Sequence, residues 1–242
     1  VKDIKDYHLA YSKLNEFINS YIGVNQSINI YEGCILRIDI NHDLKVGVKI
    51  YDYLQVISQL IYPYRDKTIY TNHDSKNLTN GISFKTKSGP ALKFYDKGLE
   101  TNNNQFFGYL RIESCVKGSH ALEKAFNNFC PILSEITEDQ LWSVLINDLH
   151  TLGLDLPVYA CKDMVLDKLK EKYGISAAIR LNATIDALSK HEKFNPAVLC
   201  NELGVKKSTL YQRIKQIKNA NIVPARNESG EMLRPLTDYL RL

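Results

Sequence analysis

Polar and apolar residues alternate strictly in one short stretch near the middle of the chain. Leu92 and Phe94 alternate there with Lys93, Tyr95 and Lys97. A period of two is typical of a β-strand, because successive side chains of a strand point to opposite faces of the sheet. The pattern therefore predicts a strand with a phenol and two ammonium groups on one face.

A second alternating stretch follows after a polar loop. Leu110 and Ile112 alternate there with Tyr109, Arg111 and Glu113. If the two strands pair, one face of the sheet collects two phenols, a carboxylate and several cations. Such a set of groups suggests chemistry at this face, and we hypothesise a tyrosine that attacks a phosphodiester.

A third strand is predicted upstream, over Gly33–Leu44. Its polar face carries Arg37, Asp39 and Asn41, and its other face is apolar. The remaining strands are expected at Lys67–Thr71, Gly81–Lys87, Ala91–Lys97 and Phe106–Val116. Residues spaced at the helical period predict helices at Asp6–Tyr21, Lys45–Tyr62 (stopped by Pro63), Gly118–Asn128, Glu138–Leu152, Lys162–Tyr173 and Ile175–Lys190.

This order of elements predicts an α+β protein with a mostly antiparallel sheet and helices on one of its faces. We expect three domains: a sheet domain at residues 1–133, a helical connector at 134–190 and a small domain at 191–242. In the small domain Asn195 caps a helix that begins at Pro196 and ends at Leu203-Gly204, and a second helix spans Ser208–Asn219.

The second of these helices is followed by a predicted hairpin, with strands at Ile222–Arg226 and Glu231–Leu236. Helix, turn, helix and hairpin in this order are typical of a winged helix-turn-helix. Residues 191–242 hold nine Lys and Arg against five Asp and Glu, so the whole net charge of +4 lies there. A positive region of this kind favours a polyanionic partner.

We predict that the second helix contacts DNA. Arg and Gln side chains suit base edges, and lysines suit phosphates. The alternative is a small helical domain that serves packing or oligomerisation. The predicted DNA-binding residues are Lys206, Lys207, Ser208, Thr209, Gln212, Arg213, Lys215 and Gln216.

Composition excludes several other classes. No apolar run approaches the roughly 20 residues of a membrane span, and no signal-peptide pattern opens the chain. The five cysteines are scattered and form no Cys-x-x-Cys pair, which predicts reduced thiols in a cytoplasmic protein and no zinc site. Because the chain begins with Val1, we expect the natural start to lie upstream.

The predicted chemistry centres on Tyr95. On this interpretation Tyr95 attacks the phosphorus, Lys97 is its electrostatic partner, and Asp39 and Glu113 hold Mg²⁺ or Mn²⁺ through hard oxygen ligands. Tyr109 is the rival nucleophile. Asn41, His42 and Glu100 are weaker candidates for the metal site. The alternative is that Tyr95 is an ordinary strand residue, with cross-strand ion pairs Arg37–Glu113 or Arg111–Asp39.

Three blocks, CILRIDINHDL, LKFYDKGLE and FGYLRIE, occur in an order and at gaps that are similar to those of the filamentous-phage replication initiators, the gene II/gene X family. The chain resembles that family from about Leu14 to Ala125. The resemblance implies a rolling-circle initiator in which Tyr95 forms a 5′-phosphotyrosyl link, and it matches Asp39 and Glu113 to the acidic positions of the family's motifs. A second kinship is with plasmid initiators, whose nucleophile follows the glutamate; this chain has Ser119-His120 there and no tyrosine.

The expected partners are origin DNA, both duplex and single-stranded, and a host helicase and polymerase. A homo-oligomer is compatible with this role, and no membrane is involved. Two other functions remain open: a catalytically inactive regulator that binds DNA through the winged helix, and a metal-dependent nuclease without a covalent step.

Overall fold

The computed structural model describes most of the chain. The described residues are 4–22, 33–60, 65–71, 79–85, 91–128, 131–132, 135–159, 162–191, 194–225, 227 and 229–240. They form two compact units, Val1–Asp39 with Cys115–Val144 and Ile40–Ser114 with Leu145–Leu242, which are described separately below. The three domains predicted from the sequence remain a prediction.

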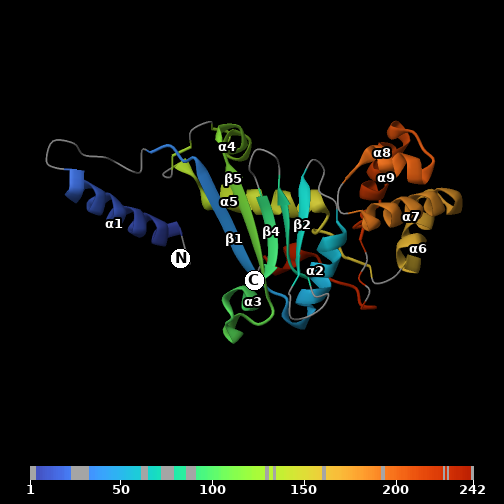
Figure 1. The fold of residues 1–242 in the computed structure, drawn as a ribbon, viewed down its shortest axis with the longest axis horizontal. Coiled ribbons are helices and arrows are strands. Elements are labelled where there is room, and N and C mark those ends of the chain that lie inside the picture. The colour runs from blue at the N-terminus through green and yellow to red at the C-terminus, as the bar shows by residue number, and fades with distance from the viewer. Residues whose placement is uncertain are drawn as a thin grey trace. The chain divides into compact units, whose positions relative to one another are not determined.

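A five-stranded antiparallel sheet forms the centre of the fold, and its strand order is β1-β5-β4-β3-β2 (Figure 1). Together with the helices it confirms the predicted α+β class. The strands are β1 (Arg37–Lys45), β2 (Asp66–Thr71), β3 (Thr79–Lys85), β4 (Ala91–Asp96) and β5 (Tyr109–Lys117).

One face of the sheet packs into the hydrophobic core, as the alternation of apolar and polar residues along the strands predicts. Leu92 and Phe94 on β4 are fully buried, as are Leu110 and Ile112 on β5. Helix α2 (Ile50–Gln59) packs against this sheet at β3 and β4. The burial of these apolar side chains on one face leaves their polar neighbours on the opposite face.

Helix α5 (Glu138–Leu152) is joined to the sheet by a buried polar contact. The Asp148 carboxylate accepts a hydrogen bond of 2.6 Å from the Ser114 hydroxyl and one of 3.2 Å from the Arg65 guanidinium. Both Asp148 and Ser114 are buried. A charge in this position is tolerated because it has hydrogen-bond partners on β5 and on the residue that precedes β2.

The strand β4 is one residue shorter than predicted, which corrects the position of Lys97. Asp96 caps the short helix α3 (Lys97–Thr101), since its Oδ1 accepts a hydrogen bond of 3.1 Å from the Leu99 amide. The cap stabilises a turn of helix where the alternation predicted more strand. Lys97 is therefore the first helical residue and does not share the strand face of Lys93 and Tyr95.

Other boundaries also shift. A 3₁₀ turn, η2 (Gly47–Lys49), precedes α2, and Pro63 lies outside the described residues. A second 3₁₀ turn, η3 (Asn104–Phe106), delays the start of β5 to Tyr109. These turns satisfy local backbone groups in ways that a period-two pattern does not reveal.

The C-terminal helices agree closely with the prediction. They are α6 (Lys162–Tyr173), α7 (Ile175–Lys190), α8 (Pro196–Leu203) and α9 (Lys207–Asn219). The Asn195 side chain caps α8, and Gly204 ends it in the left-handed conformation with φ 61°. Leu188 of α7, Leu199 of α8 and Leu210 of α9 share one buried cluster, so the three helices pack as a unit.

The predicted wing is not found in the residues that are described after α9. Ile222–Ala225 have no strand conformation, and Leu233 forms an isolated bridge with Val158. Leu236 then begins the 3₁₀ turn η5 (Leu236–Tyr239). Leu233 thus pairs with the loop that follows α5, which replaces the expected hairpin partner. The helix-turn-helix is present, and the winged helix is not confirmed.

The unit formed by Val1–Asp39 and Cys115–Val144 contains α1 (Ile4–Ile22) and α4 (Ser119–Phe126). The amphipathic helix predicted near the start is thereby confirmed as a helix, and Leu9 and Phe17 on it are exposed. Cys34 is disulfide-bonded, which corrects the expectation that all the cysteines are reduced; Cys115 and Cys200 are free. Among the described helices, none combines the length and the apolar character needed to cross a membrane.

The Asp148 contact gives a first prediction. The change Asp148→Ala removes the acceptor of two hydrogen bonds and leaves the Arg65 charge in a largely buried position. We expect the free energy of unfolding to fall by about 3 kcal/mol, measured by urea denaturation. The control is Asp163→Ala at an exposed position on α6, with an expected change within about 0.5 kcal/mol. Equal losses for the two variants would contradict the structural role of Asp148.

Candidate active site

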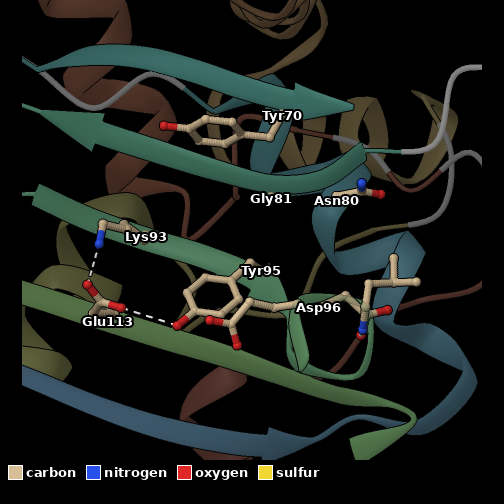
Figure 2. Close-up of a pocket in the computed structure, with 9 residues that line it drawn as sticks. Tyr70, Asn80, Gly81, Lys93, Tyr95, Asp96 and Glu113 are labelled. Atoms are coloured by element: carbon tan, nitrogen blue, oxygen red, sulfur yellow. Dashed lines mark hydrogen bonds and ion pairs between the residues drawn. The ribbon is translucent and has the colours of Figure 1, made fainter. Parts of the chain in front are cut away.

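A pocket of about 380 Å³ opens on the polar side of the central strands. Its floor and walls come from β2, β3, β4, β5 and α3 (Figure 2). Because every lining residue belongs to one compact unit, the pocket is defined within that unit. The lining residues are Tyr70, Asn80, Gly81, Lys93, Tyr95, Asp96, Leu99, Glu100 and Glu113.

The Tyr95 hydroxyl lies between an acidic and a basic side chain. It donates a hydrogen bond of 3.2 Å to Glu113 Oε2 (Figure 2). The positively charged Arg111 guanidinium also acts on this hydroxyl electrostatically. The other oxygen of Glu113 forms an ion pair with Lys93 Nζ. The phenol therefore has a proton acceptor on one side and a fixed positive charge on the other.

The surroundings raise the pKa of Tyr95 to about 12, mainly because the phenol is partly buried and secondly because the Glu113 carboxylate is close. The interaction with Arg111 acts in the opposite direction and lowers the pKa of Tyr95. Tyr95 is consequently protonated at neutral pH, since its pKa lies above the ordinary value of 10. A reaction that needs the phenolate must remove the proton during the step itself.

Arg111 is held in place by Asp43 on β1. Its Nη2 donates a hydrogen bond of 2.6 Å to Asp43 Oδ2, and its Nε donates to Oδ1, so the pair is bidentate. This pairing raises the pKa of Arg111, chiefly through the hydrogen bonds to Asp43. The suggested ion pair Arg111–Asp39 is therefore wrong, because Arg111 pairs with Asp43. The sequence did not identify Asp43 as a residue of this site.

Lys97 is not among the residues that line the pocket. It is buried, and its ammonium forms an ion pair with Glu100, which does line the pocket. The lysine that the structure places in the pocket is Lys93, whose ammonium forms an ion pair with Glu113. The difference arises because α3 begins at Lys97 and turns its side chain away from the strand direction.

Asp39 belongs to the other compact unit, so its side chain is described there. Its carboxylate forms an ion pair of 2.8 Å with Arg37. Arg37 therefore pairs with Asp39, whereas one alternative had paired it with Glu113. Burial raises the pKa of Cys115, and a hydrogen bond with Asp39 adds to the effect. Within the described part of the chain, no three His, Cys, Asp or Glu side chains gather as a metal-binding group.

The other candidates lie outside the pocket lining. Tyr109, the rival nucleophile, packs edge-on against Phe106 at a ring distance of 6.1 Å, and Lys45 Nζ lies 5.9 Å from its ring. Burial lowers the pKa of His42. Neither Asn41 nor His42 lines the pocket. Of the two tyrosines on this face, Tyr95 is the one with a carboxylate acceptor at its hydroxyl.

The helix-turn-helix presents part of the predicted DNA-binding set. Thr209 is half-buried, and so is Arg213, which donates a hydrogen bond of 3.5 Å to Thr184 on α7. Gln216 is also half-buried beside the Tyr173 hydroxyl, which donates to the Gln216 carbonyl. These three side chains do not form the exposed face that the sequence predicted. The exposed members of the set are Lys206, Lys207, Ser208, Gln212 and Lys215.

Sequence reasoning missed Tyr70, Asn80 and Gly81, which belong to strands that it had not connected with the site. The register of the sheet pairs Tyr70 with Gly81 and Gly81 with Tyr95. The sequence signal, a glycine at the beginning of a strand, is too common to identify a pocket by itself.

The fold and the pocket define an α+β protein with a polar site on the open face of its sheet. Comparison with models of protein families, with curated proteins and with solved structures gave no match for this chain.

A second prediction concerns the Tyr95 phenol. In protein labelled with ¹³C at Tyr Cζ, its resonance should titrate with a midpoint of about 12, later than that of an ordinary tyrosine. In Glu113→Gln the midpoint should fall, because the carboxylate that disfavours the phenolate is gone. The resonance that is absent from the spectrum of Tyr95→Phe is the one assigned to Tyr95. A midpoint near 10 in the unchanged chain would contradict the described surroundings of the phenol.

Proposed function

We propose that the chain is a rolling-circle replication initiator that nicks origin DNA through Tyr95. The observation that supports this proposal is the position of the Tyr95 hydroxyl between Glu113 and Arg111 in an open pocket. A nucleophilic phenol needs a group that takes its proton and a charge that stabilises its anion. The similarity of the sequence motifs to phage initiators supports the same role.

In the proposed reaction Tyr95 Oη forms a bond to the phosphorus of a single-stranded DNA phosphodiester, and its proton passes to Glu113 Oε2. The bond between phosphorus and the 3′-oxygen breaks, and that oxygen takes a proton from water. The products are a 5′-phosphotyrosyl link and a free 3′-hydroxyl. Arg111 stabilises the developing phenolate, and Lys93 is the cation closest to Glu113.

We propose Mg²⁺ or Mn²⁺ as the cofactor. Glu113 and Glu100 line the pocket, and carboxylate oxygens are the donors that these hard cations prefer. When bound, such a cation polarises a non-bridging phosphate oxygen. The assignment of Asp39 as a second ligand rests on the motif similarity. Lys97, through its ion pair with Glu100, moderates the negative charge at the pocket.

We infer that the helices α8 and α9 bind duplex origin DNA. Their exposed lysines suit phosphates, and Gln212 is exposed on α9 at a position from which an amide can contact a base edge. In the same proposal a helicase and a polymerase of the host extend the nicked strand, and the initiator acts as a monomer or a homo-oligomer.

The second candidate function is a DNA-binding regulator without nicking activity. The packed helices α8 and α9 favour it, because a helix-turn-helix can bind DNA without any contribution from a tyrosine nucleophile. A metal-dependent nuclease without a covalent step is the third candidate. The three functions differ in whether a protein–DNA adduct forms.

A third prediction separates these functions. The chain is incubated with Mn²⁺ and end-labelled single strands that tile an origin, and a covalent adduct is detected on a denaturing gel. We expect the adduct to disappear in Tyr95→Phe and to persist in Tyr109→Phe, the matched control on the neighbouring strand. Cleavage that survives Tyr95→Phe would refute the nucleophile, and no cleavage in any variant would favour the regulator.

A fourth prediction concerns α9. We expect Gln212→Ala to weaken binding to the preferred duplex by about 1–3 kcal/mol and to relax its sequence preference. Lys206→Ala should weaken binding to all duplexes alike and reduce the salt dependence by about one counterion. Binding is measured by fluorescence anisotropy at several salt concentrations. If both variants lose affinity equally on preferred and random DNA, base readout by Gln212 is excluded.

A further inference from the structure

The strand register places two tyrosines on either side of a glycine. Tyr70 on β2 lies opposite Gly81 on β3, and Gly81 lies opposite Tyr95 on β4. Directly opposed residues point to the same face of a sheet, so both phenol rings stand on the polar face (Figure 2). With strands about 4.8 Å apart, the two tyrosine Cα atoms are separated by about 10 Å across the glycine.

Gly81 leaves a notch between the two rings because it has no side chain. A Cβ atom at this position would lie 3.0 Å from the Phe94 carbonyl oxygen and 3.0 Å from Tyr95 Cβ. These close contacts favour glycine at this position, and the two tyrosines flank its backbone. Tyr70 is 47% exposed and lines the pocket, so its side chain is accessible to a ligand.

A β-bulge next to the notch directs a further side chain into the pocket. Tyr70 pairs with Gly81 while Thr71 pairs with Thr79, so Asn80 is the extra residue. A bulge of this kind re-aims the side chain of the inserted residue, and Asn80 lines the pocket. Its Oδ1 atom is buried and has no hydrogen-bond partner in the described structure. A buried acceptor of this kind is stabilised when a ligand brings a donor.

We propose that this notch binds one nucleobase of single-stranded DNA. The base stacks on Tyr70 above the Gly81 backbone, and its exocyclic amino group donates a hydrogen bond to Asn80 Oδ1. The adjoining phosphate then lies on the side of Tyr95, near the Lys93–Glu113 ion pair. A flat, aromatic ligand with an amino group fits an aromatic wall and an unpaired acceptor.

This inference rests on the proposed function for the identity of the ligand, and it deepens that function by assigning the base next to the scissile phosphate. Because the test is equilibrium binding without a divalent cation, it does not require nicking. The probe is a short fluorescent single strand that contains all four bases, and binding is measured by anisotropy in EDTA.

We expect Tyr70→Ala to weaken binding by about 5- to 100-fold, the range that loss of one base–aromatic stack produces. Tyr70→Phe keeps the ring and should remain within about twofold of the unchanged chain. The matched control is Phe107→Ala, an aromatic residue that is 64% exposed and does not line the pocket. Thermal melting checks that each variant is folded. Equal affinities for Tyr70→Ala and Phe107→Ala would overturn the proposal.

Single abasic substitutions along the same strand locate the bound base. At one position the abasic site should weaken binding to the unchanged chain and have no further effect on Tyr70→Ala, because the stack is already lost. At that position, replacement of adenine by purine, which lacks the amino group, should weaken binding to the unchanged chain and not to Asn80→Ala. Additive losses in both comparisons would show that the base does not contact these residues.

The outcomes also separate this inference from the proposed function. Base-dependent binding through Tyr70 together with cleavage that survives Tyr95→Phe would keep the nucleobase site and refute the nucleophile. An adduct that depends on Tyr95, together with binding that is insensitive to Tyr70 and to abasic sites, would support the nucleophile and refute the nucleobase site. Absence of any single-strand binding would refute the nucleobase site.

Discussion

The pairing register of β3 between β2 and β4 is the constraint on which the site depends. It places Tyr70, Gly81 and Tyr95 in one row. A slip of one residue would move each polar side chain into the core and each apolar one into solvent. The buried side chains Ile82, Phe84 and Phe94 therefore fix the position of the tyrosines. Core packing on one face determines which side chains meet on the other.

Electrostatic contacts then arrange the polar face. Asp43 holds Arg111, Arg111 contacts Tyr95, and Tyr95 donates to Glu113, whose other oxygen pairs with Lys93. Each charge in this chain of contacts has an opposite charge beside it. The phenol is thereby oriented, and its proton has a defined acceptor. The arrangement satisfies the polar groups of a partly buried surface.

Contacts of polar groups with their neighbours also explain why the sequence pattern predicted the wrong positions for two side chains. Lys97 continues the alternation of β4, but the Asp96 carboxylate accepts the Leu99 amide and starts a helix at that point. Arg213 has the spacing of an exposed residue, yet it packs toward Thr184 of α7. The Asp96 cap and the packing of α9 on α7 place these two side chains, and a periodic pattern contains no information about such partners.

The sequence by itself determined the α+β class, the buried and polar faces of the central strands, the four C-terminal helices and the position of Tyr95 and Glu113 on the polar face. These features follow from local periodicity and capping, which neighbouring residues specify. Only the tertiary structure decided that Lys93, Arg111 and Asp43 surround the tyrosine, that Tyr70 and Asn80 complete the pocket, and that Leu233 pairs with Val158 in place of a wing. Those contacts join residues far apart in the chain, and strand register and burial select them only when the whole sheet forms.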